Sequence, residues 1–217
     1  MSRKTEPKAA TKPKPPSRRE ELLEVATTLF IERGFSATSM NDISVRAGMR
    51  KASLYHHFPS KETLLIEAVT LGIESLVEAL EALSADGEAT AEHRLEHAVD
   101  LLYDSIVFSP IGRLSPLIAE TSRLYPAIAQ AFHDGYIAPI RCAFGAVIQR
   151  GIDDGAFEAI DVPAAVEIAA GPALALSLSR AMFASFEDVD ERYDVARAKA
   201  SHVTLMLRML RSPPAME

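Results

Sequence analysis

Apolar residues recur every three or four positions through most of the chain, which is the spacing of one buried face on an α-helix. The first such segment places Leu22, Leu23, Ala26, Leu29 and Phe30 on one face. No convincing run alternates apolar and polar residues, so no sheet is expected. The pattern predicts an all-α fold of about nine helices.

Capping residues and helix breakers set the expected ends of these helices. Ser17 with Glu20, and Ser39 with Asp42, have the spacing at which a hydroxyl and a later carboxylate satisfy free amides at a helix start. A glycine ends each of the first two helices. The helices are expected at about 17–34, 39–48, 51–57, 61–83 (capped by Ser60), 91–108, 117–124, 126–151, 163–186 and 190–210 (capped by Asp190).

Residues 39–58 have the layout of a helix-turn-helix, in which two short helices are joined by a tight turn at Gly48. Apolar residues of both helices would face each other and fix their angle. The second helix would then project its outer face into a major groove of DNA, where donor side chains meet guanine edges and phosphates. The inward residues are Ile43, Ala47, Met49 and Leu54, and the outward ones are Arg50, Lys51, Ser53 and His56.

The net charge of −7 at pH 7 argues weakly against nucleic acid, but its distribution reverses that argument. Residues 1–62 hold 12 Lys and Arg against 7 Asp and Glu, whereas residues 63–217 hold 11 against 23. Phosphate binding needs only a local basic surface, and the N-terminal part supplies one. Residues 1–16 are rich in Lys and Pro, so they are expected to form a disordered basic tail, which is either an arm on DNA or a solubilising leader.

Three blocks around this motif resemble the signature of the TetR/AcrR family of transcriptional regulators: Gly34–Ile43, Ala47-Gly48 and Ser53–Glu62. The resemblance covers about residues 18–70 and is specific, because many separately required positions agree. The rest of the chain matches only as a helical layout. The resemblance implies a ligand-responsive regulator, mostly a repressor, that binds a near-palindromic operator as a homodimer and is released by a small-molecule effector.

The resemblance also implies roles for single residues near the motif. Arg50 departs from the family, in which a small hydroxyl residue often caps the recognition helix, so Arg50 is expected to influence operator choice. Phe58 is expected in the core. The implied phosphate contacts are Thr38 or Ser39, Tyr55 and Lys61, and the implied base contacts are Lys51, Ser53 and His56.

The resemblance divides the chain into the tail at 1–16, a DNA-binding domain at 17–65 and a helical effector-binding and dimerisation domain at 66–217. The last two long helices are rich in small and apolar residues and would form a four-helix interface between two subunits, unless they are simply core. An effector cavity among the helices between 91 and 186 would be mostly apolar with few polar anchors. Its candidate residues, each of which could singly be core or surface instead, are Phe108, Leu117, Tyr125, Phe132, His133, Arg141, Phe144, Leu174 and Ser177.

Signals for catalysis or a metal are weak. No Gly-rich phosphate loop, nucleophile elbow or strong metal cluster stands out, so no enzyme activity, metal or cofactor is expected. His93 and His97 have a spacing that can bind zinc, but no third ligand is evident and a solvated acidic face is the preferred interpretation. The alternatives are a small-molecule enzyme or carrier, and a protein-interaction module with a vestigial DNA domain.

The cellular compartment follows from the apolar stretches and the single cysteine. The N-terminus lacks the apolar stretch of a signal peptide, and the most apolar stretch, Ile168–Leu178, is shorter than the roughly 20 residues of a membrane span. Cys142 cannot form an intramolecular disulfide and is expected to be buried. A cytoplasmic protein with no membrane contact is therefore expected.

Overall fold

The computed structural model describes residues 17–211 of the chain, except for the side chain of Ile111. The expected basic tail at 1–16 lies outside the described residues. Within them, helices follow one another without a strand, and the β contact present is an isolated bridge between Phe157 and Arg211. The expectation of an all-α fold is confirmed.

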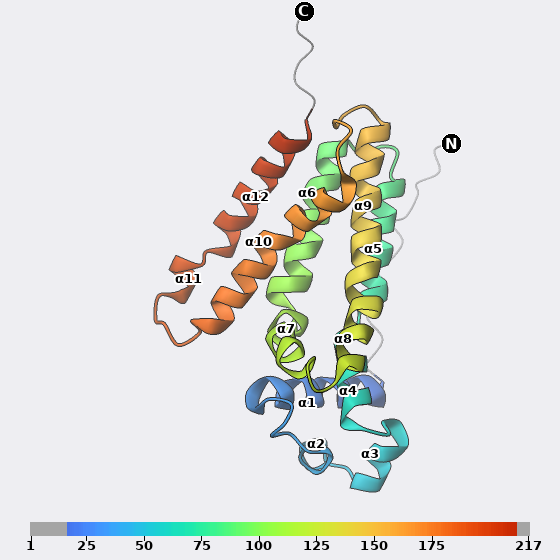
Figure 1. The fold of residues 1–217 in the computed structure, drawn as a ribbon, viewed down its shortest axis with the longest axis vertical. Helices are drawn as coiled ribbons and strands as arrows, with labels where there is room; N and C mark the ends of the chain where they lie inside the picture. Colours follow the sequence, from blue (N-terminus) through green and yellow to red (C-terminus); the bar gives the residue numbers. More distant parts are fainter. Residues whose placement is uncertain (1–16, 212–217) are drawn as a thin grey trace, which may run out of the picture.

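Four short helices form one end of an elongated molecule, drawn at the bottom of Figure 1. Helix α1 packs against α2 and α4, and α2 packs against α3. Helices α2 and α3 lie at the tip, where a long partner such as DNA can reach them. The four helices are α1 (Arg18–Arg33), α2 (Met40–Arg46), α3 (Lys51–His57) and α4 (Lys61–Thr70).

Local hydrogen bonds fix where three of these helices begin. The Ser17 hydroxyl accepts from the amide of Glu20, whose carboxylate accepts from the amide of Ser17. Ser39 and Asp42 form the same reciprocal pair at the start of α2, and the Ser60 hydroxyl caps α4. Each cap satisfies amides that the first helical turn leaves without a partner. These caps were all expected from the sequence and are confirmed.

The remaining helices build the body of the molecule. Helix α9 packs along α5 and α6, while α10 and α12 pack together and form the left side of Figure 1. A π-helical segment, η1, continues α6, and a second one, η2, joins α8 to α9. The elements are α5 (Ile73–Ala85), α6 (Ala91–Tyr103), η1 (Asp104–Phe108), α7 (Pro110–Thr121), α8 (Pro126–Phe132), η2 (His133–Ile137), α9 (Ala138–Asp153), α10 (Val162–Met182), α11 (Val189–Arg192) and α12 (Val195–Leu210).

Several helix boundaries differ from the expected ones, among them the end of α10 at Met182 rather than at residue 186. The helix expected at 61–83 is divided, because Gly72 adopts a left-handed conformation with φ of 80°. Helix α7 begins at Pro110 rather than at residue 117, since proline is compatible with the first turn of a helix. The last helix is capped by Asp194 rather than Asp190, which lies in the short α11.

Two clusters of buried apolar side chains form the core. One joins α1–α4 to α7 and α8, and includes Leu54, Phe58 and Leu114. The other fills the body around Phe144. Phe132 packs against both clusters, so the two ends of the molecule share a boundary layer of side chains. Helix α4 runs through the expected domain boundary after residue 65 and ends at Thr70, and its buried face belongs to the first cluster.

Helix α10 has more exposed apolar surface than its neighbours. It is 21 residues long with a mean hydropathy of 1.5 over its most apolar window, and 28% of that window is buried. By length and composition it could therefore span a membrane, so the expectation that this stretch is too short was wrong. However, one side of α10 packs against α6, α7, α9 and α12 and belongs to the helical core. This packing does not explain why the other side of α10 is apolar and exposed.

Cys142 and His202 have unexpected surroundings. Cys142 is exposed, so the expectation of a buried thiol was wrong. His202, on α12, is 6% exposed, and neither of its ring nitrogens has a hydrogen-bond partner among the described residues. Its ring lies 5.8 Å from the ring of Tyr103, whose buried hydroxyl also lacks such a partner. Burial lowers the pKa of His202 below its ordinary value of 6.5.

We expect the free energy of unfolding to fall as the pH drops from 7 towards 5. At pH 7 His202 is neutral in both states, but below 6.5 the unfolded chain takes up a proton that the folded chain does not. The loss approaches about 1.4 kcal/mol for each pH unit between the two pKa values. Urea unfolding at several pH values measures it. His202→Leu should flatten this dependence, and a dependence as steep as that of the unaltered protein would contradict the assignment to His202.

Candidate DNA-binding and effector sites

The turn between α2 and α3 depends on Gly48. Its φ is 62°, a left-handed conformation that side chains with a Cβ rarely adopt. The amide of Met49 donates to the carbonyl of Ser44 at 2.9 Å, which closes the turn. The chain then enters α3 with Arg50 as its N-cap. This confirms the two short helices and the glycine turn expected from the sequence.

Helix α3 is held by its buried face and by an arginine from α1. Leu54 and Phe58 are fully buried. The guanidinium of Arg19 lies 4.3 Å from the centre of the Phe58 ring and donates to the carbonyl of His57 at 2.8 Å. Arg19 also forms an ion pair with Glu67 of α4 at 2.5 Å. One side chain therefore connects α1, the end of α3 and α4, which fixes the orientation of α3.

The outer face of α3 presents donors to solvent. Arg50, Lys51 and His56 are exposed, Tyr55 is 44% exposed, and Ser53 is partly buried. The ammonium of Lys51 lies 5.9 Å from the ring of Tyr55, on the same face of the helix. The structure thus brings together all the residues of α3 that the sequence assigned to bases and phosphates. Their contact with DNA remains a prediction.

Of the two residues proposed before α2, Ser39 is the better placed for a phosphate. Thr38 is 1% exposed, and its hydroxyl donates to the carbonyls of Leu29 and Gly34. Its side chain is therefore committed to holding α1 against the start of α2. Ser39 is exposed, and its hydroxyl and amide donate to Asp42 and lower its pKa, so a phosphate contact by Ser39 would replace one of these hydrogen bonds. Asp42 thus stays ionised at the positive end of α2.

The ammonium group of Lys61, which the sequence assigned to a phosphate, already has a partner within the protein. Its ammonium donates to the carbonyl of Phe35 at 2.6 Å and lies 4.2 Å from the centre of the Phe35 ring. The side chain thereby ties α4 to the loop before α2. A phosphate contact by Lys61 would add to, or replace, this internal contact.

The body contains an apolar cavity of about 310 Å³ between η1, α7, η2, α9 and α10. The rings of Phe132 and Tyr136 are stacked 5.1 Å apart along one wall. Burial raises the pKa of Tyr136, whose hydroxyl forms a hydrogen bond with Ser105 of η1. The other lining residues are Leu102, Ile106, Gly112, Ser115, Ile137, Ile140, Arg141, Glu167, Ala170 and Leu174.

Three of the nine residues expected in an effector site line this cavity: Phe132, Arg141 and Leu174. Ser177 is buried beside it, against Gly112. The others lie elsewhere, because sequence position does not show which way a helix is rotated in the body. Phe144 is fully buried in the core, Leu117 and Tyr125 pack in the cluster of the DNA-binding end, and Phe108 and His133 are exposed.

The polar end of the cavity was only half identified from the sequence. Arg141 forms an ion pair with Glu167 across α9 and α10, and both side chains are about half exposed. Sequence spacing offered no signal for this pair, since 26 residues separate its members. Tyr136 could have been found, because it follows Phe132 by one helical turn.

A solvent-facing, donor-rich helix in a helix-turn-helix, carried on an all-α body with an apolar cavity, defines a DNA-binding regulator that can respond to a ligand. The model of the family "Bacterial regulatory proteins, tetR family" matches residues 22–68. The HTH-type transcriptional repressor KstR2 of Rhodococcus jostii is 33% identical over 146 residues, covering 67% of this chain and 71% of that protein. The chain belongs to the TetR family of transcriptional regulators.

Solved structures share the complete fold. FadR of Bacillus subtilis in complex with stearoyl-CoA has a TM-score of 0.68 at 19% identity, covering 87% of this chain and 97% of that one. The ketosteroid transcriptional regulator KstR2 of Mycobacterium tuberculosis has a TM-score of 0.61 at 22% identity, covering 91% and 96%. At these identities the likeness shows the fold, which extends the resemblance over the body as well.

We expect Gly48→Ala to destabilise the protein by about 1–2 kcal/mol, because the left-handed conformation brings a Cβ too close to the backbone. Thermal unfolding of the purified protein measures the effect. Gly87→Ala is the matched control, since Gly87 has open space for a Cβ and no positive φ. Equal stability of the two variants would show that the turn does not require glycine.

Proposed function

We propose that the protein is a repressor that binds a near-palindromic operator as a homodimer and releases it when a small molecule enters the cavity of the body. The observation that carries this proposal is the exposed face of α3, which bears hydrogen-bond donors, on a helix-turn-helix whose inner face is buried. A relative that covers two thirds of the chain is named a repressor, which supports repression over activation. Such a protein acts on DNA and would work in the cytoplasm.

The DNA contacts divide by their chemistry. Tyr55, Ser39 and Lys61 donate to phosphates, which gives affinity without sequence preference. Lys51, Ser53 and His56 approach base edges in the major groove. Arg50, exposed at the first turn of α3, adds a guanidinium that suits guanine. The body carries the negative charge, so the basic end alone attracts DNA.

The exposed side of α10 is the proposed dimer interface, together with α12. Ile168, Leu178 and Met182 on α10 are 50%, 47% and 65% exposed, and Leu205 on α12 is 62% exposed. Burying this surface against a second copy would give a four-helix interface and account for the apolar face of α10. Two subunits related by a twofold axis would place their α3 helices about 34–36 Å apart, or somewhat further, for successive major grooves.

The effector we propose has a compact apolar body and one charged end. The cavity is apolar apart from its Arg141–Glu167 end. A carboxylate on the effector would compete with Glu167 for Arg141 and would gain a bidentate contact. The relative KstR2 carries ketosteroid in the name of its structure, which makes a keto-steroid acid a reasonable probe beside a medium-chain fatty acid.

Close packing between η2 and α4 offers a route from the cavity to the DNA. A Cβ at Gly135 would lie 2.8 Å from Thr70, so η2 lies directly against the end of α4. Tyr136, the next residue, lines the cavity. An effector that displaces Tyr136 would therefore shift η2 and push on α4, and with it the DNA-binding end. The effector thereby favours a dimer whose α3 helices no longer fit the operator.

We expect Tyr55→Phe and Lys51→Ala to weaken operator binding by about 1–3 kcal/mol, and Lys51→Ala also to reduce the preference for the operator over unrelated DNA. Mobility shift on the DNA upstream of the protein's own gene and on unrelated DNA measures both. Leu178→Asp should also lose affinity, but through loss of the dimer, visible as a halved mass in light scattering. Unchanged affinity in the first two variants would remove α3 from the DNA contacts.

We expect Ala170→Phe to fill part of the cavity and abolish release of DNA by the effector, while operator affinity without effector stays within about twofold. Release is measured with decanoate, decylamine and a keto-steroid acid. Arg141→Gln should remove the response to the acids. Ala119→Phe, on the exposed side of α7, is the control. A response to the acids that survives in both cavity variants would place the effector elsewhere.

A further inference from the structure

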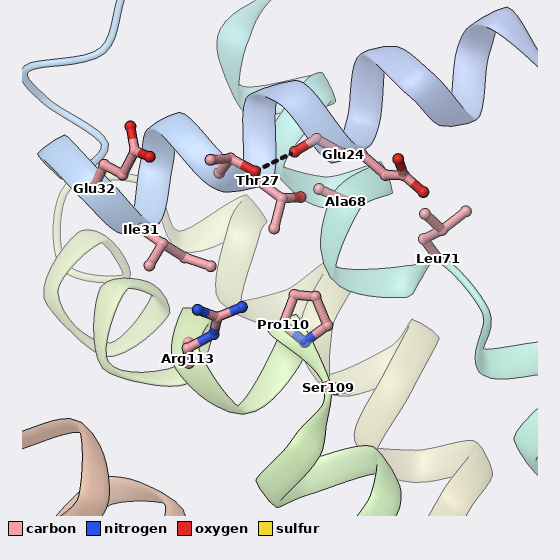
Figure 2. Close-up of a pocket in the computed structure, with 10 residues that line it drawn as sticks. Glu24, Thr27, Ile31, Glu32, Ala68, Leu71, Ser109, Pro110 and Arg113 are labelled. Atoms are coloured by element: carbon pink, nitrogen blue, oxygen red, sulfur yellow. Dashed lines mark hydrogen bonds between the residues drawn. The ribbon is translucent and has the colours of Figure 1, made fainter. Parts of the chain in front are cut away.

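A second cavity, of about 450 Å³, lies between the DNA-binding end and the body. Helices α1 and α4 form one wall, and the start of α7 forms the other (Figure 2). It shares no lining residue with the apolar cavity proposed for the effector. Its lining residues are Glu24, Thr27, Thr28, Ile31, Glu32, Ala68, Leu71, Ser109, Pro110 and Arg113.

The chain connection between α1–α4 and the body borders this interdomain cleft. Leu71 lies at the break between α4 and α5, where Gly72 is left-handed. Ser109 and Pro110 lie at the junction of η1 with α7. Any movement of α1–α4 against the body must change the shape of the cleft, because its walls belong to the two moving parts.

Three polar side chains in the cleft lack partners among residues 17–211. Thr27 is 8% exposed and its hydroxyl makes no hydrogen bond there, whereas the neighbouring Thr28 hydroxyl donates to the carbonyl of Glu24 at 2.9 Å. Neither the guanidinium of Arg113 nor the carboxylate of Glu24 forms an ion pair in that part of the chain. In Figure 2, Thr27 and Arg113 point into the cleft from opposite walls, and Glu24 extends towards Leu71.

The Thr27 side chain is largely buried, but its hydroxyl points into the cleft, where it can form a hydrogen bond with a ligand. The floor between the polar groups is apolar, formed by Ala68, Leu71 and Pro110. Glu32, at the far end, is 3.7 Å from Arg46, which partly neutralises it. The cleft therefore presents one hydroxyl, from Thr27, and two exposed charges, the cation of Arg113 and the anion of Glu24, separated by apolar surface.

We propose that this interdomain cleft binds a small zwitterion with an apolar middle. The carboxylate pairs with Arg113, the ammonium pairs with Glu24, and the Thr27 hydroxyl donates to the ligand. Glu24 and Glu32 lie about 12 Å apart along α1, since each helical residue advances about 1.5 Å, so the cleft accepts a linear molecule better than a compact one. Bound there, the molecule bridges α1 and α7 and restrains movement of α1–α4 against the body.

The test uses the full-length protein without DNA, with methyl-labelled Ile, Leu and Ala observed by NMR. We expect 6-aminohexanoate to shift the methyl signals of Ile31, Ala68 and Leu71, and not those of Ile140 and Leu174 in the other cavity. Hexanoate and hexylamine, which each lack one charge, should bind about tenfold more weakly, since each loses a charge-assisted contact.

Three variants separate this site from a nonspecific effect. Arg113→Gln and Thr27→Val should each weaken binding of 6-aminohexanoate, the first by about tenfold. Arg123→Gln, which changes an exposed arginine outside the cleft, should bind as the unaltered protein does. Signals distant from the cleft report that each variant is folded. Shifts confined to the other cavity, equal binding of hexanoate, or full binding by Arg113→Gln would each overturn the proposal, whatever the protein's affinity for DNA.

Discussion

A helix of seven residues is too short to be stable in water, and this protein must nevertheless hold one at a fixed angle to DNA. Everything at the DNA-binding end serves that constraint. Leu54 and Phe58 bury one face of α3, Gly48 sets its angle to α2, and Arg19 clamps its last turn. The outer face can then consist of donors, because it contributes nothing to folding.

The same constraint links the DNA-binding end to the body. The core beneath α3 includes α4 and extends to α7 and α8, so contacts with the body also stabilise the short helices α2 and α3. Phe132 belongs to this boundary layer and also lines the apolar cavity. A change in the shape of the cavity that moves Phe132 would therefore also disturb the core that supports α3. A ligand in the cavity could affect DNA binding over a short distance, because this one layer of side chains contacts both the cavity and the core of the DNA-binding end.

Local signals in the sequence were sufficient for the DNA-binding end. Ser17, Ser39 and Ser60 cap helices through residues three positions away, and Gly48 makes its turn through its own backbone. The division of the helix at 61–83 was missed, because a single Gly72 in a helical pattern is compatible with either outcome.

The cavities depend on contacts between distant segments, and this is why they were poorly predicted. Phe144 and Arg141 are one turn apart on α9, yet one is core and the other faces Glu167 of α10. The rotation of α9 decides between them, and that rotation is set by α5, α6 and α10 together. The position of Thr27 in the cleft was likewise not apparent from the sequence, since the cleft is formed by α1, α4 and the start of α7 together.

Arg50 shows how stability and specificity are divided within α3. As the N-cap it makes no side-chain hydrogen bond to the first turn, which forgoes a contribution of about 1 kcal/mol. In an isolated helix this loss would be serious, but α3 is held by its buried face and by Arg19. The guanidinium of Arg50 is consequently not needed as a cap and is exposed at the start of α3. A position that the family often uses for a cap can thus be used here to choose among operators, because the tertiary contacts have made the cap dispensable.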